Sequence, residues 1–305
     1  RTVSPWVTGL VLFSAVLHAS WNALLKGGGD RPRSVAAMAA AAGLASAGWA
    51  CVRPAPRVES WFYIFLSVVL HVAYHFLLVW AYRHGDLGVS YPVARWSSPL
   101  LVAAGAAVLA GERPDALTLV GIVLVCGGIF GLARGRAGAR GIAPALLTGA
   151  TIAAYSVADG LGSRAAGNAW SYAAWLFVFN GPAVLPVLLW RDPRFDAGAR
   201  RPAAGGAVSL VGYAIVIWAA SIGPMGRVSA LRESSVLVAA VLGWLFLGER
   251  LGSRRLVACA IVAAGAACLG LRGWPAAQIT PSASGASGAS ASRPARASRP
   301  CHGTP

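Results

Sequence analysis

Hydrophobic residues in this chain come in long uninterrupted runs, separated by short segments that carry glycine, proline, arginine or aspartate. A run of roughly 20 apolar residues is long enough for a helix to cross the hydrocarbon core of a bilayer. By that rule the pattern predicts ten membrane-spanning helices. Their expected ranges are 5–25, 34–52, 60–82, 89–110, 115–133, 141–162, 170–190, 205–222, 227–248 and 253–271.

Continuous apolar runs favour helices over barrel strands, because the strands of a membrane barrel alternate between lipid-facing and lumen-facing residues. Lipid cannot satisfy backbone N–H and C=O groups, so a helix is the expected spanning element. The predicted fold class is therefore all-α, polytopic and membrane-embedded. Tryptophans near the expected helix ends agree with this, since aromatic side chains gather at membrane interfaces; they are Trp6, Trp49, Trp61, Trp170, Trp190 and Trp274.

Composition supports a lipid environment. The chain is 57% hydrophobic and 12% charged, with a mean hydropathy of +0.63, whereas soluble domains have about 25% charged residues. A net charge of +16 does not indicate nucleic-acid binding, because the basic residues are dispersed and form no basic helix face. The first apolar run lacks a small-residue cleavage site, so we expect a span and not a removed signal peptide.

The cysteines indicate neither a disulfide framework nor a zinc site. None forms a CxxC pair, and all but one lie in or at the edge of apolar runs. We expect small, buried and unpaired thiols. The five residues are Cys51, Cys126, Cys259, Cys268 and Cys301.

The two halves of the chain resemble each other. At a shift of 137 residues, RWSS (95–98) aligns with RESS (232–235), and a GER segment at 111–113 aligns with one at 248–250. The predicted organisation is a five-helix repeat at 1–137, a second at 138–273, and a Ser/Ala/Pro/Arg-rich tail at 274–305 that is expected to be disordered.

Five helices per repeat is an odd number, so the second repeat must enter the membrane from the opposite side. Many secondary transporters are built from inverted repeats and bind substrate near the midplane between them. We therefore predict a secondary transporter that works by alternating access. No GxxxxGK[ST] loop occurs, so direct use of ATP is not indicated.

Four segments carry a family resemblance: HASWNALLK (18–26), YPVARWSSPLLVAAGAAVLAGER (91–113), AYSVADGLGSR (154–164) and SALRESSVLVAAVLGWLFLGER (229–250). Together they resemble the ten-helix EamA-type permeases of the drug/metabolite transporter superfamily. The resemblance extends over about residues 5–272. It implies a multi-pass permease of the cell membrane for a small polar or amphipathic metabolite, without a cofactor and with a proton or other ion as coupling partner.

Arg95 and Arg232 occupy equivalent positions in the two repeats. An ionised side chain at the centre of a span costs roughly 2.5–3.5 kcal/mol, which makes each a candidate for function. Sixteen uncharged residues, or about 24 Å of helix, separate Arg95 from Glu112. Inversion then places the two arginines near opposite faces, where we expect them to line two mouths of one pathway and attract anions. The alternative is that both snorkel to an interface. Glu233 is expected to neutralise a neighbouring arginine.

Two polar pairs also occupy equivalent positions, on the first helix of each repeat. His18 and Asn22 are four residues apart, as are Tyr155 and Asp159, so each pair shares one helix face. We expect them to hydrogen-bond the substrate. Asp159 is the only carboxylate in its span and is a candidate proton carrier, although pairing with Arg164 near the helix end is the favoured alternative.

His71, Tyr74 and His75 share one face of the third predicted helix. Two histidines four residues apart can ligate zinc, but neither a third ligand nor carboxylates are evident nearby. We expect a polar face toward the substrate cavity, with Trp80 and Trp218 as stacking surfaces or as ordinary packing. The histidine face is also the only support for an alternative function, an intramembrane enzyme.

The remaining charges predict helix ends and orientation. Glu112 and Glu249 are expected to support a local turn or pair with the adjacent arginine, and Lys26 is expected to anchor its helix at an interface. Outside the tail, seven Lys/Arg lie on the predicted side of the termini and fourteen on the other. The positive-inside rule then places the termini outside the cytoplasm.

Overall fold

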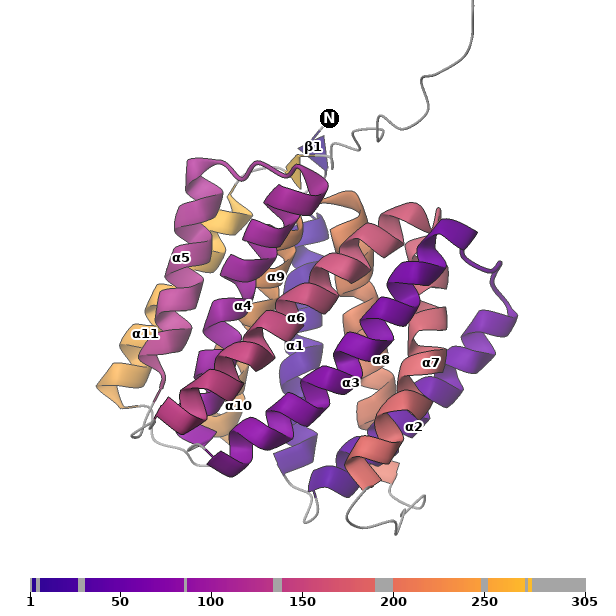
Figure 1. The fold of residues 1–305 in the computed structure, drawn as a ribbon. Helices are drawn as coiled ribbons and strands as arrows, with labels where there is room; N and C mark the ends of the chain where they lie inside the picture. Colours follow the sequence, from indigo (N-terminus) through magenta and orange to yellow (C-terminus); the bar gives the residue numbers. More distant parts are fainter. Residues whose placement is uncertain are drawn as a thin grey trace, which may run out of the picture.

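The architecture comes from a computed structural model, which describes residues 2–3, 6–26, 31–84, 87–133, 139–189, 200–247, 252–271 and 274–275. The described part is a bundle of helices that lie side by side (Figure 1). Its α-helices are α1 (Trp6–Lys26), α2 (Arg31–Cys51), α3 (Trp61–His84), α4 (Leu87–Ala110), α5 (Ala116–Gly131), α6 (Ala139–Ala165), α7 (Ala169–Leu189), α8 (Arg200–Ile222), α9 (Met225–Glu233), α10 (Ser235–Leu247) and α11 (Ser253–Gly270).

The predicted helices are confirmed, with one exception. Nine of them are single helices whose ends lie within five residues of the expected ends. Of the helices in the described residues, seven contain segments long and apolar enough to cross a membrane. The length and continuity of the apolar runs therefore indicated the positions of nine helices, and the layout of ten membrane spans stays a prediction.

The exception is the ninth predicted helix, at 227–248. The structure has two helices here, α9 and α10, with Ser234 between them. The interruption is one residue long: Ser234 keeps right-handed helical angles, and its backbone N–H donates to the carbonyl of Leu231 at 3.1 Å, as in a tighter 3₁₀ turn. Irregular backbone at membrane depth is tolerated where protein surrounds it, and every residue of α9 is buried.

The distribution of side chains is that of a multi-pass membrane protein. Large apolar side chains such as Phe62 and Leu109 are more than half exposed on the outside of the bundle, whereas Arg95, Asp159 and Glu233 are buried within it. An aqueous solvent would favour the opposite arrangement, because exposing apolar surface to water is unfavourable. Lipid on the outside accounts for both observations.

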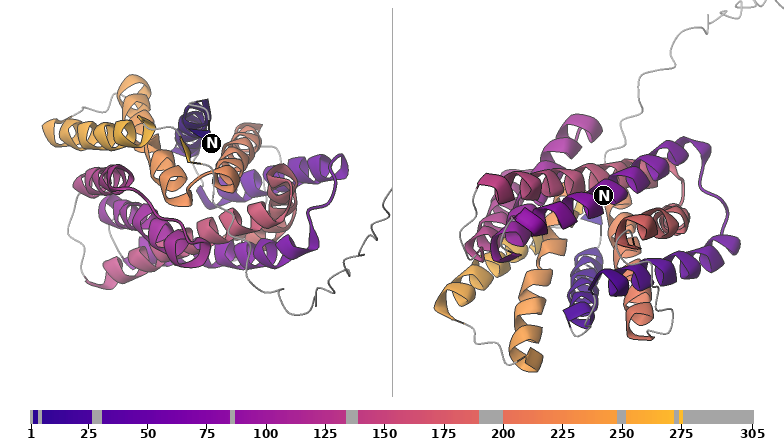
Figure 2. Two further views of the ribbon diagram at one scale, coloured as in Figure 1. Left: turned by 90° about the horizontal axis from the view of Figure 1, so that it is seen from above. Right: turned by 60° about the horizontal axis from the view of Figure 1, so that its bottom comes forward.

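Helices from the two halves of the chain pack against each other. α1 packs on α8 and α3 packs on α6, while α2 contacts α7, α4 contacts α9 and α5 contacts α11. α3, α4 and α6 lie on one side of the bundle and α1, α8 and α9 on the other, as the views in Figures 1 and 2 agree. α5 and α11 approach closely at Gly121, where an added Cβ would lie 2.7 Å from Cγ of Leu269.

The predicted tail starts inside the described part of the chain. β2 (Trp274–Pro275) pairs antiparallel with β1 (Thr2–Val3), so the tail does not begin as irregular chain at 274. The rest of the tail and Cys301 lie outside the described residues, as do the side chains of Lys26 and Glu249. The four described cysteines are free thiols, as expected, but Cys51 is exposed and only Cys126 is fully buried.

Candidate functional site

Two arginines and one carboxylate meet in the middle of the bundle. Oε2 of Glu233 lies 2.7 Å from Nε of Arg95, and Oε1 lies 3.4 Å from an Nη of Arg232. Glu233 has no exposed surface, and the arginine side chains are 9% and 6% exposed. The expected role of Glu233 as a neutralising partner is confirmed.

The prediction that Arg95 and Arg232 lie at opposite mouths of the pathway is wrong, because both reach the same carboxylate. The structure places eight residues of α4 before Arg95, or about 12 Å of helix, and seven residues of α9 before Arg232, or about 10 Å. Each arginine therefore lies well inside the bundle, where α4 and α9 pack against each other. Snorkelling to an interface is also excluded by this burial.

The central cluster carries more positive than negative charge and leaves hydrogen-bonding groups unused. Within the described residues, Nε of Arg232 and the hydroxyl of Ser229, which line the same cavity, have no hydrogen-bond partner, although both residues are at least nine-tenths buried. Buried polar groups are almost always hydrogen-bonded, because leaving one unpaired costs about 1–3 kcal/mol. Such a cluster is typical of a site that a ligand completes.

Asp159 on α6 forms a second buried polar centre. Tyr172 on α7 donates to its Oδ1 at 3.0 Å, and Tyr213 on α8 donates to its Oδ2 at 2.6 Å. The favoured prediction, that Asp159 pairs with Arg164, is wrong. Five residues separate the two, so they lie on different faces of α6, and only the face of Asp159 points at the two tyrosines.

Arg164 instead joins four helix ends on the side of the bundle where α6 and α8 end. It donates to Oε1 of Glu112 at 2.6 Å and to the carbonyls of Ala220 and Gly223 at 3.1 and 2.8 Å. The other oxygen of Glu112 accepts the backbone N–H of Met225, at the first turn of α9, at 2.9 Å. Glu112 thus connects distant helices, in contrast to the predicted role of supporting its own turn.

The predicted polar face of α3 meets α6 at Tyr155. The ring of His71 stacks on Tyr155 with centroids 4.1 Å apart and presents an edge to Tyr213 at 5.9 Å. Tyr74 contacts Tyr155 edge-on at 6.0 Å. Nδ1 of His71 bonds the Ser67 carbonyl at 2.8 Å, and Nδ1 of His75 bonds the His71 carbonyl at 2.7 Å. Each histidine therefore uses one nitrogen on its own helix.

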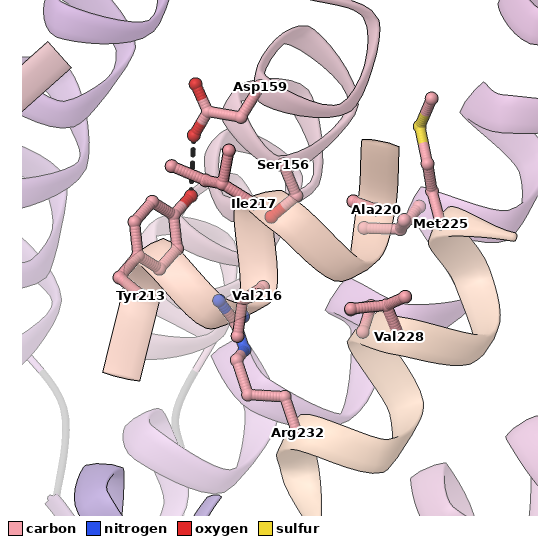
Figure 3. Close-up of a pocket in the computed structure, with 11 residues that line it drawn as sticks. Ser156, Asp159, Tyr213, Val216, Ile217, Ala220, Met225, Val228 and Arg232 are labelled. Carbon is pink, nitrogen blue, oxygen red and sulfur yellow. Dashed lines mark hydrogen bonds between the residues drawn. The ribbon is translucent and has the colours of Figure 1, made fainter. Parts of the chain in front are cut away.

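A cavity connects Asp159 with Arg232. Its volume is about 20 Å³, roughly the room that one water molecule needs. Figure 3 shows Asp159 and Tyr213 toward one end of this space and Arg232 at the other, with Val216 and Ile217 between them. The other lining residues are Val102, Ser156, Ala220, Met225, Val228 and Ser229.

Of the ten residues predicted to bind substrate, only Asp159 and Arg232 line this cavity. Among the others, the residues of α1 and Trp218 contact other groups. Nδ2 of Asn22 donates to the carbonyl of His18 at 2.7 Å, and the ring of His18 packs edge-on against Trp21 at 5.1 Å. Trp218 stacks on both Trp6 and Trp170, at 5.1 and 6.1 Å. Its faces are therefore covered by other tryptophans, as in ordinary packing. Trp80 is 42% exposed.

Sequence reasoning missed Tyr172, Tyr213, Ser156 and Ser229. A usable signal existed for Tyr213, which is the only tyrosine in its predicted span. A phenol in hydrocarbon needs a partner for its hydroxyl, and Asp159 is the one carboxylate of a neighbouring span. The two serines carried no such signal, since serine is common in membrane helices.

Comparisons with known proteins agree with the helical fold and identify part of the chain. Residues 139–271, from the start of α6 to just past α11, match the model described as the EamA-like transporter family. No curated protein gives a significant match. A solved crystal structure shares 23% sequence identity, covers 88% of this chain and 98% of its own, and superposes with a TM-score of 0.66. At that identity the likeness establishes the fold alone.

The family match falls on the segments that hold Asp159, Tyr213, Arg232 and Glu233. The resemblance stated from four sequence segments is thus confirmed for the second half of the chain. Residues 139–271 of this multi-pass membrane protein are similar to the EamA-like transporter family.

Proposed function

We propose that the protein is a secondary active transporter, which moves a small polar or amphipathic metabolite through the cavity between Asp159 and Arg232 by alternating access. The observation that carries this is the cavity itself. It is polar at both ends, contains unpartnered buried donors, and lies in a helical domain of a transporter family. Buried ionisable groups inside a membrane bundle are typical of substrate and ion pathways.

The helix packing supports a layout of ten spans in two inverted repeats, with α9 and α10 together as one span. Exchange of the two halves turns the α1–α8 contact into the α6–α3 contact, and both are present. The contacts α2–α7 and α5–α11 each join a helix to its own counterpart. Such self-paired contacts are expected along a two-fold axis between repeats, where transporters place their substrate.

In this proposal the bonds between Arg164 and Glu112 close one end of the cavity. They hold the backbones of Ala220 and Met225, and both residues line the cavity. Opening toward that side of the membrane requires these bonds to separate. The structure then corresponds to a state of the cycle that is closed on the side where α6 ends.

Asp159 is the proposed carrier of a coupling proton, because it is a buried carboxylate in the cavity wall. The intramembrane enzyme is less well supported. His71 and His75 each bond a backbone carbonyl of their own helix, and the described residues contain no cluster of three or more His, Cys, Asp or Glu that could hold a metal ion.

Transport in proteoliposomes tests the proposal. Vesicles that contain the purified protein are loaded with an unlabelled metabolite mixture and diluted into labelled single metabolites, with and without an imposed pH gradient. Accumulation of a label that the Arg232→Gln protein fails to accumulate supports the proposal. Absence of uptake for every metabolite class, together with activity that chelators inhibit, supports the enzyme instead.

A C-terminal reporter active only in the cytoplasm tests the predicted outside location of the termini. Activity of this reporter would contradict that location.

A further inference from the structure

We propose that the cavity is the binding site of one water molecule, held by the hydroxyls of Ser156 on α6 and Ser229 on α9 and by Nε of Arg232. The water joins α6 to α9 through hydrogen bonds that these side chains do not make with each other. The inference concerns the arrangement of these helices in the structure, and it does not depend on transport of any substrate.

The size of the cavity suits one water molecule. Its volume is about 20 Å³, and a cavity needs roughly 10–15 Å³ by this measure to hold one water. Sites for small molecules have volumes of about 300 Å³ or more. In this arrangement of the helices the cavity therefore admits water, and a metabolite needs a wider one.

Three polar groups that line the cavity have no hydrogen-bond partner within the described residues. They are Oγ of Ser156, Oγ of Ser229 and Nε of Arg232, and all three atoms are buried. A buried polar group without a partner costs about 1–3 kcal/mol. Buried waters typically make about three hydrogen bonds to such groups. The number of unpartnered groups thus matches what a buried water requires.

The donor and acceptor roles of the three groups are compatible with one water. A charged arginine only donates, so the water accepts from Nε of Arg232. A serine hydroxyl can donate or accept. One hydroxyl therefore donates to the second lone pair of the water, and the other accepts one of its hydrogens. The remaining hydrogen is left for an acceptor such as Asp159, which lines the same cavity.

Two helices bring these groups to one place. Ser156 lies three residues before Asp159 on α6, and Ser229 lies three residues before Arg232 on α9. Residues three apart share a helix face, so each helix presents a hydroxyl and a charged group together. α6 contacts both α8 and α9, and Figure 3 shows Ser156 between Asp159 and Arg232 in this view.

The formal charges around the cavity favour a neutral occupant. Glu233 lies against Arg95 and Arg232, which leaves one positive charge. Asp159 on the cavity wall supplies one negative charge. A sodium ion would lie beside the guanidinium of Arg232 and be repelled by it. A chloride ion would add a charge to a buried set that already sums to zero, which is costly.

Radiolytic labelling of the purified full-length protein in detergent tests the inference. X-rays convert water into hydroxyl radicals, which oxidise neighbouring side chains, and methionine becomes the sulfoxide. The chain has two methionines. Met225 lines the cavity and is 2% exposed, whereas Met38 packs against Gly205 on α8, outside the cavity lining, and is 6% exposed.

The two methionines give opposite expectations. Exposure alone predicts faster oxidation of Met38. With a water in the cavity, we expect Met225 to be oxidised severalfold faster than Met38, because radicals form beside it. Oxidation of Met225 that is no faster than that of Met38 overturns the inference.

A double variant removes the water. Ser156→Ala with Ser229→Ala leaves Arg232 as the one polar partner of the three, and a buried water uses about two to four. We expect oxidation of Met225 to fall to the rate of Met38 or below. The melting temperature should change little, because immobilising a water costs up to about 2 kcal/mol, which offsets the bonds it makes.

Ser171→Ala is the matched control. It also removes a buried hydroxyl without a partner in the described part of the chain, but Ser171 lies on α7 and outside the cavity lining. Oxidation of Met225 should therefore stay as in the wild type. If the double variant also keeps the wild-type rate, solvent reaches Met225 by opening of the bundle, and the inference is overturned.

Replacement of chloride by gluconate at equal ionic strength separates water from an anion. With water in the site, oxidation of Met225 and the melting temperature stay the same. A melting temperature that falls without chloride in the wild type, and not in the double variant, assigns the site to chloride and overturns the inference. Neither measurement needs a substrate. Absence of uptake in proteoliposomes therefore leaves the water site standing, and loss of the water site leaves the transporter.

Discussion

Two clusters of arginine and glutamate connect distant helices, and they differ in how completely their hydrogen bonds are made. At the helix ends, Arg164 has three partners and both oxygens of Glu112 accept a bond. In the middle, Arg232 approaches Glu233 only to 3.4 Å, and its Nε has no partner within the described residues.

The difference separates a structural cluster from a binding one. A buried network whose members are all satisfied fixes one arrangement, whereas a partly satisfied network costs free energy until something completes it. The Arg164 cluster contains its own partners and includes backbone groups, so no ligand is needed. The Arg232 cluster opens into a cavity, and its missing partners are the groups that a bound molecule brings.

The largest expected effect comes from Glu233→Gln, which leaves Arg95 and Arg232 without their shared carboxylate. Removing one member of a buried ion pair destabilises a protein by about 3–5 kcal/mol. We expect loss of the folded protein, measured as the fraction that elutes as a single species in detergent. The double variant Glu233→Gln with Arg95→Gln should recover part of this loss. Equal stability of Glu233→Gln and wild type would mean that the central cluster is not ionised.

Glu112→Gln is expected to have the next largest effect, and a different one. The partly exposed pair loses its charge, so stability falls less than for Glu233→Gln, while the end of the cavity loosens. The measurement is alkylation of a cysteine placed at Val228, in protein whose native cysteines are replaced by alanine. We expect faster alkylation from the side where α6 ends. Unchanged alkylation contradicts the proposed closure.

Asp159→Asn is expected to leave the fold intact, since the amide still bonds Tyr172 or Tyr213. An amide does not carry a proton at ordinary pH, so uptake should lose its dependence on an imposed pH gradient. Exchange without a gradient should continue for any substrate that does not need the charge of Asp159. Uptake that still follows the pH gradient in this variant assigns the coupling to another group. Asp115→Asn serves as the control for a carboxylate outside the cavity.

The smallest expected effect is that of Ser229→Ala. Its hydroxyl has no partner within the described residues, so removing it should leave the melting temperature unchanged or slightly raised, because the desolvation cost disappears. Ligand affinity should fall by several-fold if the hydroxyl binds substrate. A clear loss of stability instead indicates a structural bond for Ser229 and weakens the contrast between the clusters.

The sequence specified the helices far better than the contacts between them. Apolar run length is a local property, and it placed nine helices to within five residues. The difference at 227–248 is a single tighter turn at Ser234, which the length of an apolar run does not register. Charge partners depend on helix rotation and on packing between distant segments. For that reason Arg164 could not be assigned to Glu112, nor Tyr213 to Asp159, from spacing alone.

The residues predicted for the site illustrate the same limit. His71, Tyr74, Tyr155 and Asp159 were found by their position on shared helix faces, and the structure does bring His71 and Tyr74 onto Tyr155. Arg232 and Asp159 do share one cavity. Asn22 met the same criterion, but its amide donates to the carbonyl of His18 on its own helix. Helical periodicity selects a face, and it does not say which neighbour that face meets.

The interruption at Ser234 gives the two halves unequal mechanical properties. α4 continues through the equivalent position as one helix of 24 residues, although it contains Pro92 and Pro99, whereas α9 and α10 are separate rods of 9 and 13 residues. An interrupted helix can bend at the interruption, whereas a continuous helix tilts as a whole. In the proposed alternating access, the second half therefore has a point at Ser234 where its helix can bend, and the described part of α4 has no such interruption.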